Sequence, residues 1–155
     1  LADPNKVVIR GGSAGGYAVL NGLVHSKVFA AGANYYGVAE LIMLAEDTHD
    51  FESRYLDSLI GPYPEQKELY IERSPLTHAD NLTSPLIIFQ GSDDPIVPPS
   101  QSQAFRDACI KNGVKYKYFE FEGESHGFRK SQTITTCAIE ELKFFGEVLG
   151  FVPAD

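Results

Sequence analysis

A serine, two adjacent aspartates and a histidine have the types and order needed for nucleophilic catalysis. Ser13 lies within residues 11–15, Gly-Gly-Ser-Ala-Gly, which fit the pattern G-x-S-x-G. Asp93 and Asp94 come later in the chain, and His126 follows in a Gly-rich stretch. A serine hydroxyl becomes a strong nucleophile when an imidazole takes its proton, and a carboxylate must orient that imidazole. The order Ser, Asp, His accompanies a G-x-S-x-G nucleophile in one large class of such sites.

The residues around Ser13 predict the local structure that this nucleophile needs. Residues 7–9 indicate a short buried strand, and residues 14–24 indicate a helix with an apolar face. Because the chain reverses sharply between them, we expect a strained backbone at Ser13 and an exposed hydroxyl. The four glycines between residues 11 and 16 are expected to permit close approach of strand and helix. The backbone N–H of Ala14 then points toward an anion forming beside the serine.

G-x-S-x-G is a short motif, and taken alone it leaves two other interpretations open. It also fits an ordinary Gly-rich turn between strand and helix, or a loop that binds phosphate. The two later groups favour catalysis: the aspartates come shortly after the run 86–91, and His126 follows the alternating run 115–121. Carboxyl ends of parallel strands meet at one edge of a sheet, so these groups should converge. The spacing does not decide between Asp93 and Asp94, one of which would cap a turn or face solvent.

The order of the predicted elements indicates an open α/β fold with a mostly parallel sheet flanked by helices. Beyond the first strand and helix we expect a strand within residues 29–38, a broken helical region over 39–70, a strand at 86–91, a helix at about 98–111, a strand at 115–121 and a helix at about 131–148. The continuous apolar runs indicate strands that are buried on both faces. The alternating run indicates an edge strand. We interpret residues 1–155 as a single partial domain.

Composition and charge exclude several classes of function. The formal net charge is -8 without a Lys/Arg cluster, which argues against nucleic-acid and membrane-surface partners. No segment has the apolar length of a membrane span, and we find no signal sequence. Cys109 and Cys137 are interpreted as free buried thiols, so we predict a cytoplasmic protein. No second histidine lies at ligand spacing, so we predict no metal site and no cofactor.

Five motifs extend over nearly the whole chain. They are residues 11–17, 34–38, 72–75, 91–101 and 123–128. Together they resemble the C-terminal catalytic domain of the prolyl oligopeptidase family, the α/β-hydrolase serine peptidases that include acylaminoacyl and dipeptidyl peptidases. The resemblance implies that the chain is the C-terminal portion of an α/β-hydrolase fold. It assigns Ser13 as the nucleophile, His126 as the proton carrier and Asp94 as the acid, with the Ala14 N–H as one oxyanion donor.

The resemblance implies a serine peptidase that hydrolyses short peptides through an acyl-enzyme. The same triad serves esters, so a carboxylesterase or related acyl hydrolase is the alternative, and a catalytically silent structural fragment is another. Candidates for the acyl pocket are Tyr35, Tyr36 and the insertion around Phe51, Arg54 and Tyr55, with the rings for apolar side chains and the Arg54 guanidinium for a carboxylate. Packing of these residues in the core is an equally open interpretation.

Members of this family carry a second oxyanion donor upstream of the nucleophile and an N-terminal β-propeller, and this chain has neither. It starts at Leu1 and lacks the first half of the expected sheet, which suggests a piece of a longer protein. We expect the chain alone to be weakly active or inactive, because losing one donor costs about 10²–10³ in turnover. The unpaired edge of the first strand predicts homo-oligomerisation through that edge.

Overall fold

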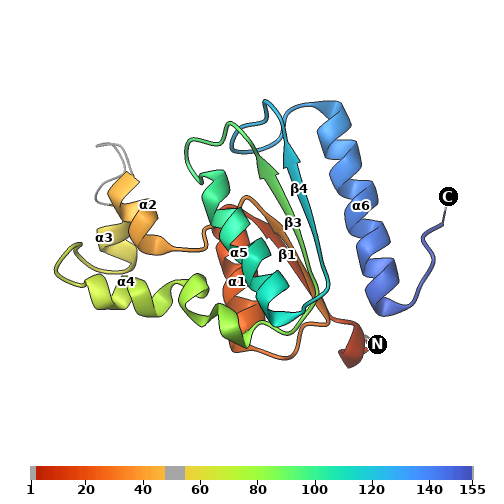
Figure 1. The fold of residues 1–155 in the computed structure, drawn as a ribbon, viewed down its shortest axis with the longest axis horizontal. Helices are drawn as coiled ribbons and strands as arrows, with labels where there is room; N and C mark the ends of the chain where they lie inside the picture. The colour runs from red at the N-terminus through yellow and green to blue at the C-terminus, as the bar shows by residue number, and fades with distance from the viewer. Residues whose placement is uncertain (1–2, 48–54, 155) are drawn as a thin grey trace.

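The centre of the molecule is a four-stranded parallel sheet (Figure 1). The structure is a computed structural model that describes residues 3–47 and 55–154. The strands are β1 (Val8–Gly12), β2 (Ala31–Tyr35), β3 (Leu86–Gly91) and β4 (Tyr116–Phe121). They follow one another across the sheet in the order of the sequence. All four carboxyl ends therefore lie at the same edge of the sheet.

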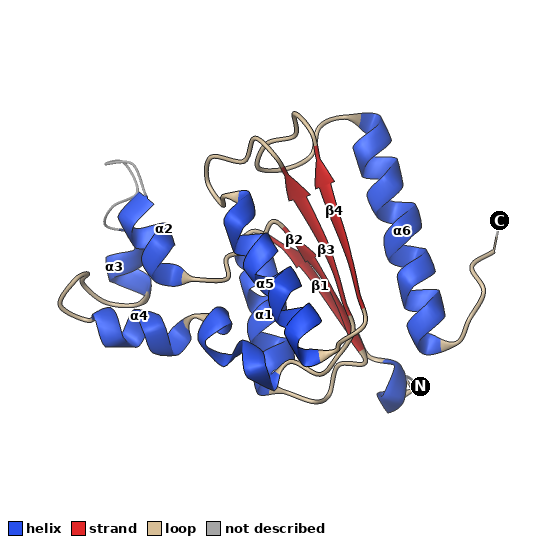
Figure 2. Ribbon diagram, in the orientation of Figure 1, coloured by secondary structure: helices blue, strands red, loops and turns tan. Residues whose placement is uncertain are grey.

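Helices cover both faces of the sheet, as Figure 2 shows. The elements besides the strands are η1 (Pro4–Lys6), α1 (Ala14–His25), α2 (Leu41–Asp47), α3 (Tyr55–Leu59), α4 (Lys67–Arg73), η2 (Pro75–Asn81), α5 (Pro99–Asn112) and α6 (Ser131–Leu149). Helices α1 and α5 pack on one face of the sheet, and α6 packs on the other. The three short helices α2, α3 and α4 lie together at one side, between β2 and β3 in the chain.

Strand β3 forms the middle of the core, and all six of its residues are buried. Leu86 and Ile88 pack with α1 and α5, whereas Ile87 and Phe89 pack on the α6 side. Burying one such side chain contributes roughly 1.5–3 kcal/mol. Strand β3 is thus buried on both faces of a parallel sheet, as its continuous apolar run predicted. Strand β4 is half-exposed at one edge, also as predicted.

Within the described residues, β1 pairs with β2 alone and forms the opposite edge of the sheet. The predicted homo-oligomerisation through this edge stays a prediction. Cys109 on α5 and Cys137 on α6 are free and buried, as the sequence indicated. Burial raises the pKa of each thiol to about 12. The described residues contain no helix with the length and apolarity to cross a membrane, and the compartment stays a prediction.

Candidate active site

The turn between β1 and α1 places Ser13 at the edge of the sheet where the strands end. Its backbone has φ 56 and ψ -118, and among the described residues Tyr36 is the other non-glycine with positive φ. A residue in such a sparsely populated region costs on the order of 1–3 kcal/mol and persists where its surroundings hold it. The Ser13 N–H donates to the carbonyl of Tyr35 at 3.0 Å, and the Ser13 carbonyl accepts from the Tyr17 N–H at 2.9 Å. The predicted strain at the serine is confirmed.

The glycines of this turn do not share one role. A Cβ on Gly11 would lie 2.5 Å from the backbone carbonyl carbon and oxygen of Gly15, so the end of β1 touches the first turn of α1 there. A Cβ on Gly16 would lie 2.5 Å from the Asn34 side-chain oxygen. Gly15 itself has no atom within 4 Å of a Cβ position. The prediction that Gly15 must lack a side chain is therefore wrong: its backbone is what Gly11 approaches, and its own Cβ would face open space.

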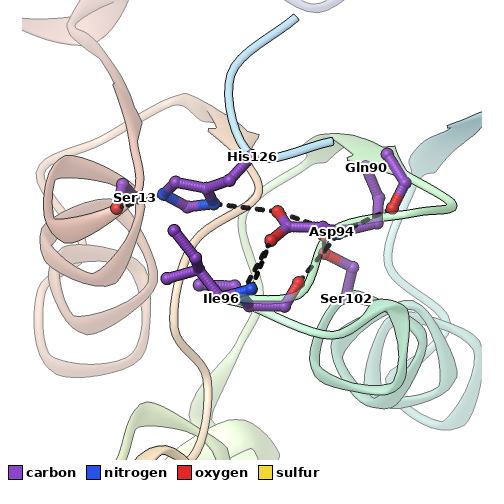
Figure 3. Close-up of polar contacts among 8 residues, drawn as sticks. Ser13, Gln90, Asp94, Ile96, Ser102 and His126 are labelled. Atoms are coloured by element: carbon purple, nitrogen blue, oxygen red, sulfur yellow. Dashed lines mark hydrogen bonds and ion pairs between the residues drawn. The ribbon is translucent and has the colours of Figure 1, made fainter. Parts of the chain in front are cut away.

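Three of the predicted side chains meet beyond the ends of the strands. Figure 3 shows the imidazole of His126 between Ser13 and Asp94. His126 Nε2 lies 2.8 Å from Ser13 Oγ, and His126 Nδ1 lies 2.8 Å from Asp94 Oδ2. The tautomer that satisfies both contacts carries its proton on Nδ1, which donates to the carboxylate, while Nε2 accepts from the hydroxyl. This geometry leaves Nε2 ready to take the proton of Ser13.

Asp94, not Asp93, contacts the histidine. The Asp94 side chain is fully buried, and its second oxygen, Oδ1, accepts the backbone N–H groups of Ile96 and Val97 at 2.9 Å each. Asp93 is exposed, and its carboxylate accepts the hydroxyl of Ser92 at 2.6 Å. A buried carboxylate with every oxygen hydrogen-bonded is held in one orientation, which suits a group that must align an imidazole.

The loop that carries Asp94 is held by two polar residues that the sequence patterns did not single out. Gln90, at the end of β3, is fully buried, and its amide nitrogen donates to the carbonyl of Val97 at 3.0 Å. The same nitrogen lies 3.5 Å from Asp94 Oδ2, and the Gln90 side-chain oxygen accepts the hydroxyl of Ser102 at 2.7 Å (Figure 3). The available signal was one amide side chain at the end of an otherwise apolar strand.

A cavity of about 600 Å³ opens beside Ser13, with His126 and Ala14 in its wall. Ala14 begins α1, so its backbone N–H has no acceptor within the helix and is available to an oxyanion. Much of the remaining wall is apolar and comes from α2, α3 and the Asp94 loop; it includes Leu41, Leu44, Leu56, Leu59, Ile96 and Val97. Arg73, at the end of α4, lines the cavity as well.

Of the candidates for the acyl pocket, Tyr55 lines the cavity, whereas Tyr35 and Tyr36 do not. The Tyr35 hydroxyl donates to Glu141 of α6 at 2.6 Å, and its ring centroid lies 4.7 Å from that of Phe89. Burial, and then the hydrogen bond to Glu141, raise the pKa of Tyr35 above its ordinary value. The Tyr36 ring is 4.9 Å from the imidazole of His126, centroid to centroid. Tyr35 packs against the core on the α6 side, and the assignment of Tyr35 and Tyr36 to the acyl pocket stays a prediction. Phe51 and Arg54 lie outside the described residues.

Comparison with known proteins identifies the family. Residues 1–151 match the prolyl oligopeptidase family. The chain belongs to this family. The solved structure of a puromycin-hydrolyzing peptidase from Mycobacterium tuberculosis superposes with a TM-score of 0.96 and 48% identity, covering 100% of this chain and 24% of that one. These findings confirm the predicted family and the α/β-hydrolase fold.

Two curated relatives show the range of activities named in the family's neighbourhood. Dipeptidyl aminopeptidase BIII of Pseudoxanthomonas mexicana is 33% identical over 97% of this chain and 23% of its own length. Esterase LipQ of Mycobacterium tuberculosis is 28% identical over 96% of this chain and 39% of its own length. The prolyl oligopeptidase family and these relatives are hydrolases. The chain spans about a quarter of the length of the dipeptidyl aminopeptidase and of the puromycin-hydrolyzing peptidase.

In the described residues, no group of three or more His, Cys, Asp or Glu side chains is placed to hold a metal ion.

Proposed function

We propose that this chain carries the catalytic triad of a serine peptidase that cleaves short peptides and related amides. Ser13 is the nucleophile, His126 carries the proton, and Asp94 orients the imidazole. The proposal rests on one observation above all: two hydrogen bonds of 2.8 Å connect Ser13 Oγ, His126 and Asp94 in a single line. Membership of the prolyl oligopeptidase family supports it, because the same family includes relatives named as peptidases.

Acylation begins when Ser13 Oγ attacks the carbonyl carbon of the scissile amide. His126 Nε2 takes the hydroxyl proton as the new C–O bond forms. The carbonyl oxygen gains negative charge, and the backbone N–H of Ala14 donates to it. When the tetrahedral intermediate collapses, the C–N bond breaks and the leaving nitrogen takes the proton from Nε2. The products of this half-reaction are a free amine and an ester on Ser13.

Deacylation repeats the same proton transfers with water as the nucleophile. A water molecule gives one proton to His126 Nε2 and adds to the ester carbonyl carbon. The bond between that carbon and Ser13 Oγ then breaks, and Oγ takes the proton back from Nε2. Asp94 keeps Nδ1–H pointing at its carboxylate throughout, and it stabilises the imidazolium that forms in both steps. The enzyme returns to its starting state and releases a carboxylic acid.

The cavity beside Ser13 favours an apolar side chain on the acyl side of the scissile bond. Its walls include large hydrophobic side chains that are about half exposed, namely Leu59 at 58% and Ile96 at 49%. Covering such surface with a substrate side chain is favourable by roughly 25 cal/mol per Å² of apolar area removed from water. The volume of about 600 Å³ accommodates an aromatic or long aliphatic group. We therefore propose substrates with residues such as Phe or Leu at this position.

The rest of the protein is proposed to complete the site. The chain spans about a quarter of the peptidases it matches, and a second oxyanion donor is expected to come from residues upstream of β1. Loss of one such donor lowers turnover by about 10²–10³. The full-length protein is therefore the right material for testing the activity.

The test compares substrates on the full-length protein. We expect higher kcat/KM for Phe- and Leu-p-nitroanilides than for the Asp and Lys compounds, because the cavity offers apolar walls. The control is Ser13→Ala, which should lower kcat by on the order of 10⁶. Hydrolysis of p-nitrophenyl esters without cleavage of any anilide would contradict peptidase activity and favour the esterase alternative. No Ser13-dependent hydrolysis of either class would favour the silent fragment.

A further inference from the structure

The loop over residues 122–130 carries His126 from β4 to α6, and it contains one buried acidic side chain. Glu124 is 2% exposed, whereas Glu122, two residues earlier, is exposed. A carboxylate taken out of water is costly unless hydrogen bonds or a charge compensate it. The groups that hydrogen-bond Glu124 must therefore compensate its burial.

The Glu124 carboxylate binds the backbone of the residues that follow His126 in the loop. Its Oε2 accepts the backbone N–H of Arg129 at 3.0 Å, and its Oε1 accepts that of Lys130 at 2.9 Å. The hydroxyl of Thr133, in the first turn of α6, also hydrogen-bonds this carboxylate. Burial alone would raise the pKa of Glu124, but these hydrogen bonds outweigh it and lower the pKa below its ordinary value. The carboxylate is thus charged and fixed at neutral pH.

The backbone of Glu124 joins this loop to the loop that carries Asp94. The Glu124 carbonyl accepts the Asp93 N–H at 3.0 Å. A Cβ on Gly91 would lie 2.3 Å from the same carbonyl oxygen, so the end of β3 and the His126 loop are in direct contact. Glu124 therefore connects three parts of the molecule: the Asp94 loop, the His126 loop and the start of α6.

We infer that Glu124 is a positioning residue that holds His126 in register with Asp94 and Ser13, an inference that rests on the triad proposed above. His126 lies near the middle of the loop between Glu124 and Arg129, and the Glu124 carboxylate connects the two ends of this loop by hydrogen bonds. Without these hydrogen bonds, the imidazole can move out of its position between the Asp94 carboxylate and the Ser13 hydroxyl. A misplacement of about 1 Å in a catalytic group can cost 10²-fold in rate.

A purely structural role for Glu124 makes a different prediction. If Glu124 only anchors the start of α6, its loss lowers the thermal stability of the protein and leaves the chemistry of the folded fraction unchanged. If it positions His126, its loss lowers kcat at unchanged KM, because Glu124 is not among the residues that line the cavity beside Ser13. The hydrogen-bonded Nδ1 proton of His126 provides a second readout, a low-field proton resonance that needs no turnover.

The experiment compares Glu124→Gln with the control Glu122→Gln in the full-length protein. The amide keeps the size of the side chain but turns its NH₂ group against one of the two backbone N–H donors. We expect kcat for a Phe-p-nitroanilide to fall by about 10- to 100-fold with KM nearly unchanged, and the low-field resonance to disappear. Glu122 is exposed and accepts Lys130 Nζ through its backbone carbonyl, which the control retains, so that variant should match the wild type in both readouts.

A second variant keeps the test decisive if Glu124→Gln does not fold. Thr133→Val removes one donor to the carboxylate while preserving volume, and it should lower kcat in the same direction by a smaller factor. A folded Glu124→Gln or Thr133→Val protein with unchanged kcat and an intact resonance would overturn the inference. If the wild type proves inactive, the proposed function fails, yet the resonance still decides: its loss in Glu124→Gln supports positioning, and its retention refutes it.

Discussion

Asp93 and Asp94 are neighbours in the sequence with separate structural roles. Asp94 is buried beside His126, and its carboxylate accepts hydrogen bonds from the imidazole and from the backbone N–H groups of Ile96 and Val97. Asp93 is exposed and accepts a serine hydroxyl. Adjacent residues in a turn point in different directions, so the spacing alone predicted that one of them would align the histidine. The resemblance to the prolyl oligopeptidase family selected Asp94, and the contacts agree with that assignment.

The two aspartates provide a matched pair of variants. Asp94→Asn should lower kcat by roughly 10⁴, because an amide in this position favours the wrong imidazole tautomer. Asp93→Asn should retain activity within a few-fold, since its carboxylate does not contact His126. Both are to be measured as kcat in the full-length protein under the same conditions. Equal losses in the two variants would contradict the assignment of Asp94.

At the scale of elements, β1, the turn at Ser13 and α1 act as a unit. The turn holds its serine at positive φ, and the close contact of Gly11 with Gly15 sets how tightly the strand meets the helix. A side chain at position 11 must displace backbone, which neither the strand nor the first helical turn readily allows. At position 15 the Cβ meets nothing within 4 Å.

Alanine substitutions at these two glycines should therefore differ in their effect on stability. Gly11→Ala should lower the free energy of unfolding by about 1–3 kcal/mol, because the added methyl overpacks a backbone contact. Gly15→Ala should leave it unchanged or raise it by up to about 1 kcal/mol, since alanine favours the helix over glycine. Urea unfolding of the wild type and both variants measures the difference. A Gly11→Ala protein as stable as Gly15→Ala would show that the turn tolerates expansion.

The elements were predictable from sequence to different degrees. The apolar run of β3 and the amphipathic pattern of α6 carry their own signals, and both elements lie where those signals indicated. The contacts of Gln90 and Glu124 carried no such signal, because each depends on loops brought together by the sheet. Such tertiary contacts decide how the catalytic loops are held, and composition or periodicity does not reveal them.

At the scale of the whole molecule, the parallel sheet brings distant parts of the chain to one edge. Ser13 and His126 are 113 positions apart, yet their side chains are in hydrogen-bond contact. This convergence was predictable, because each group follows its own parallel strand. The cavity was predictable only in part: Tyr55 was a candidate, but the leucines of the wall occur in short helices whose pattern equally fits a core. Tyr35 ends β2 near the nucleophile and packs against Phe89 of the sheet, and its assignment to the acyl pocket stays a prediction.

The most direct test of the proposed triad is covalent labelling of the full-length protein with a fluorophosphonate, followed by mass spectrometry of the modified peptide. We predict one label per chain within residues 1–155, located on Ser13, and strongly slowed labelling in His126→Ala because no base takes the hydroxyl proton. A wild-type protein without label on Ser13, or equal labelling rates in the wild type and His126→Ala, would contradict it.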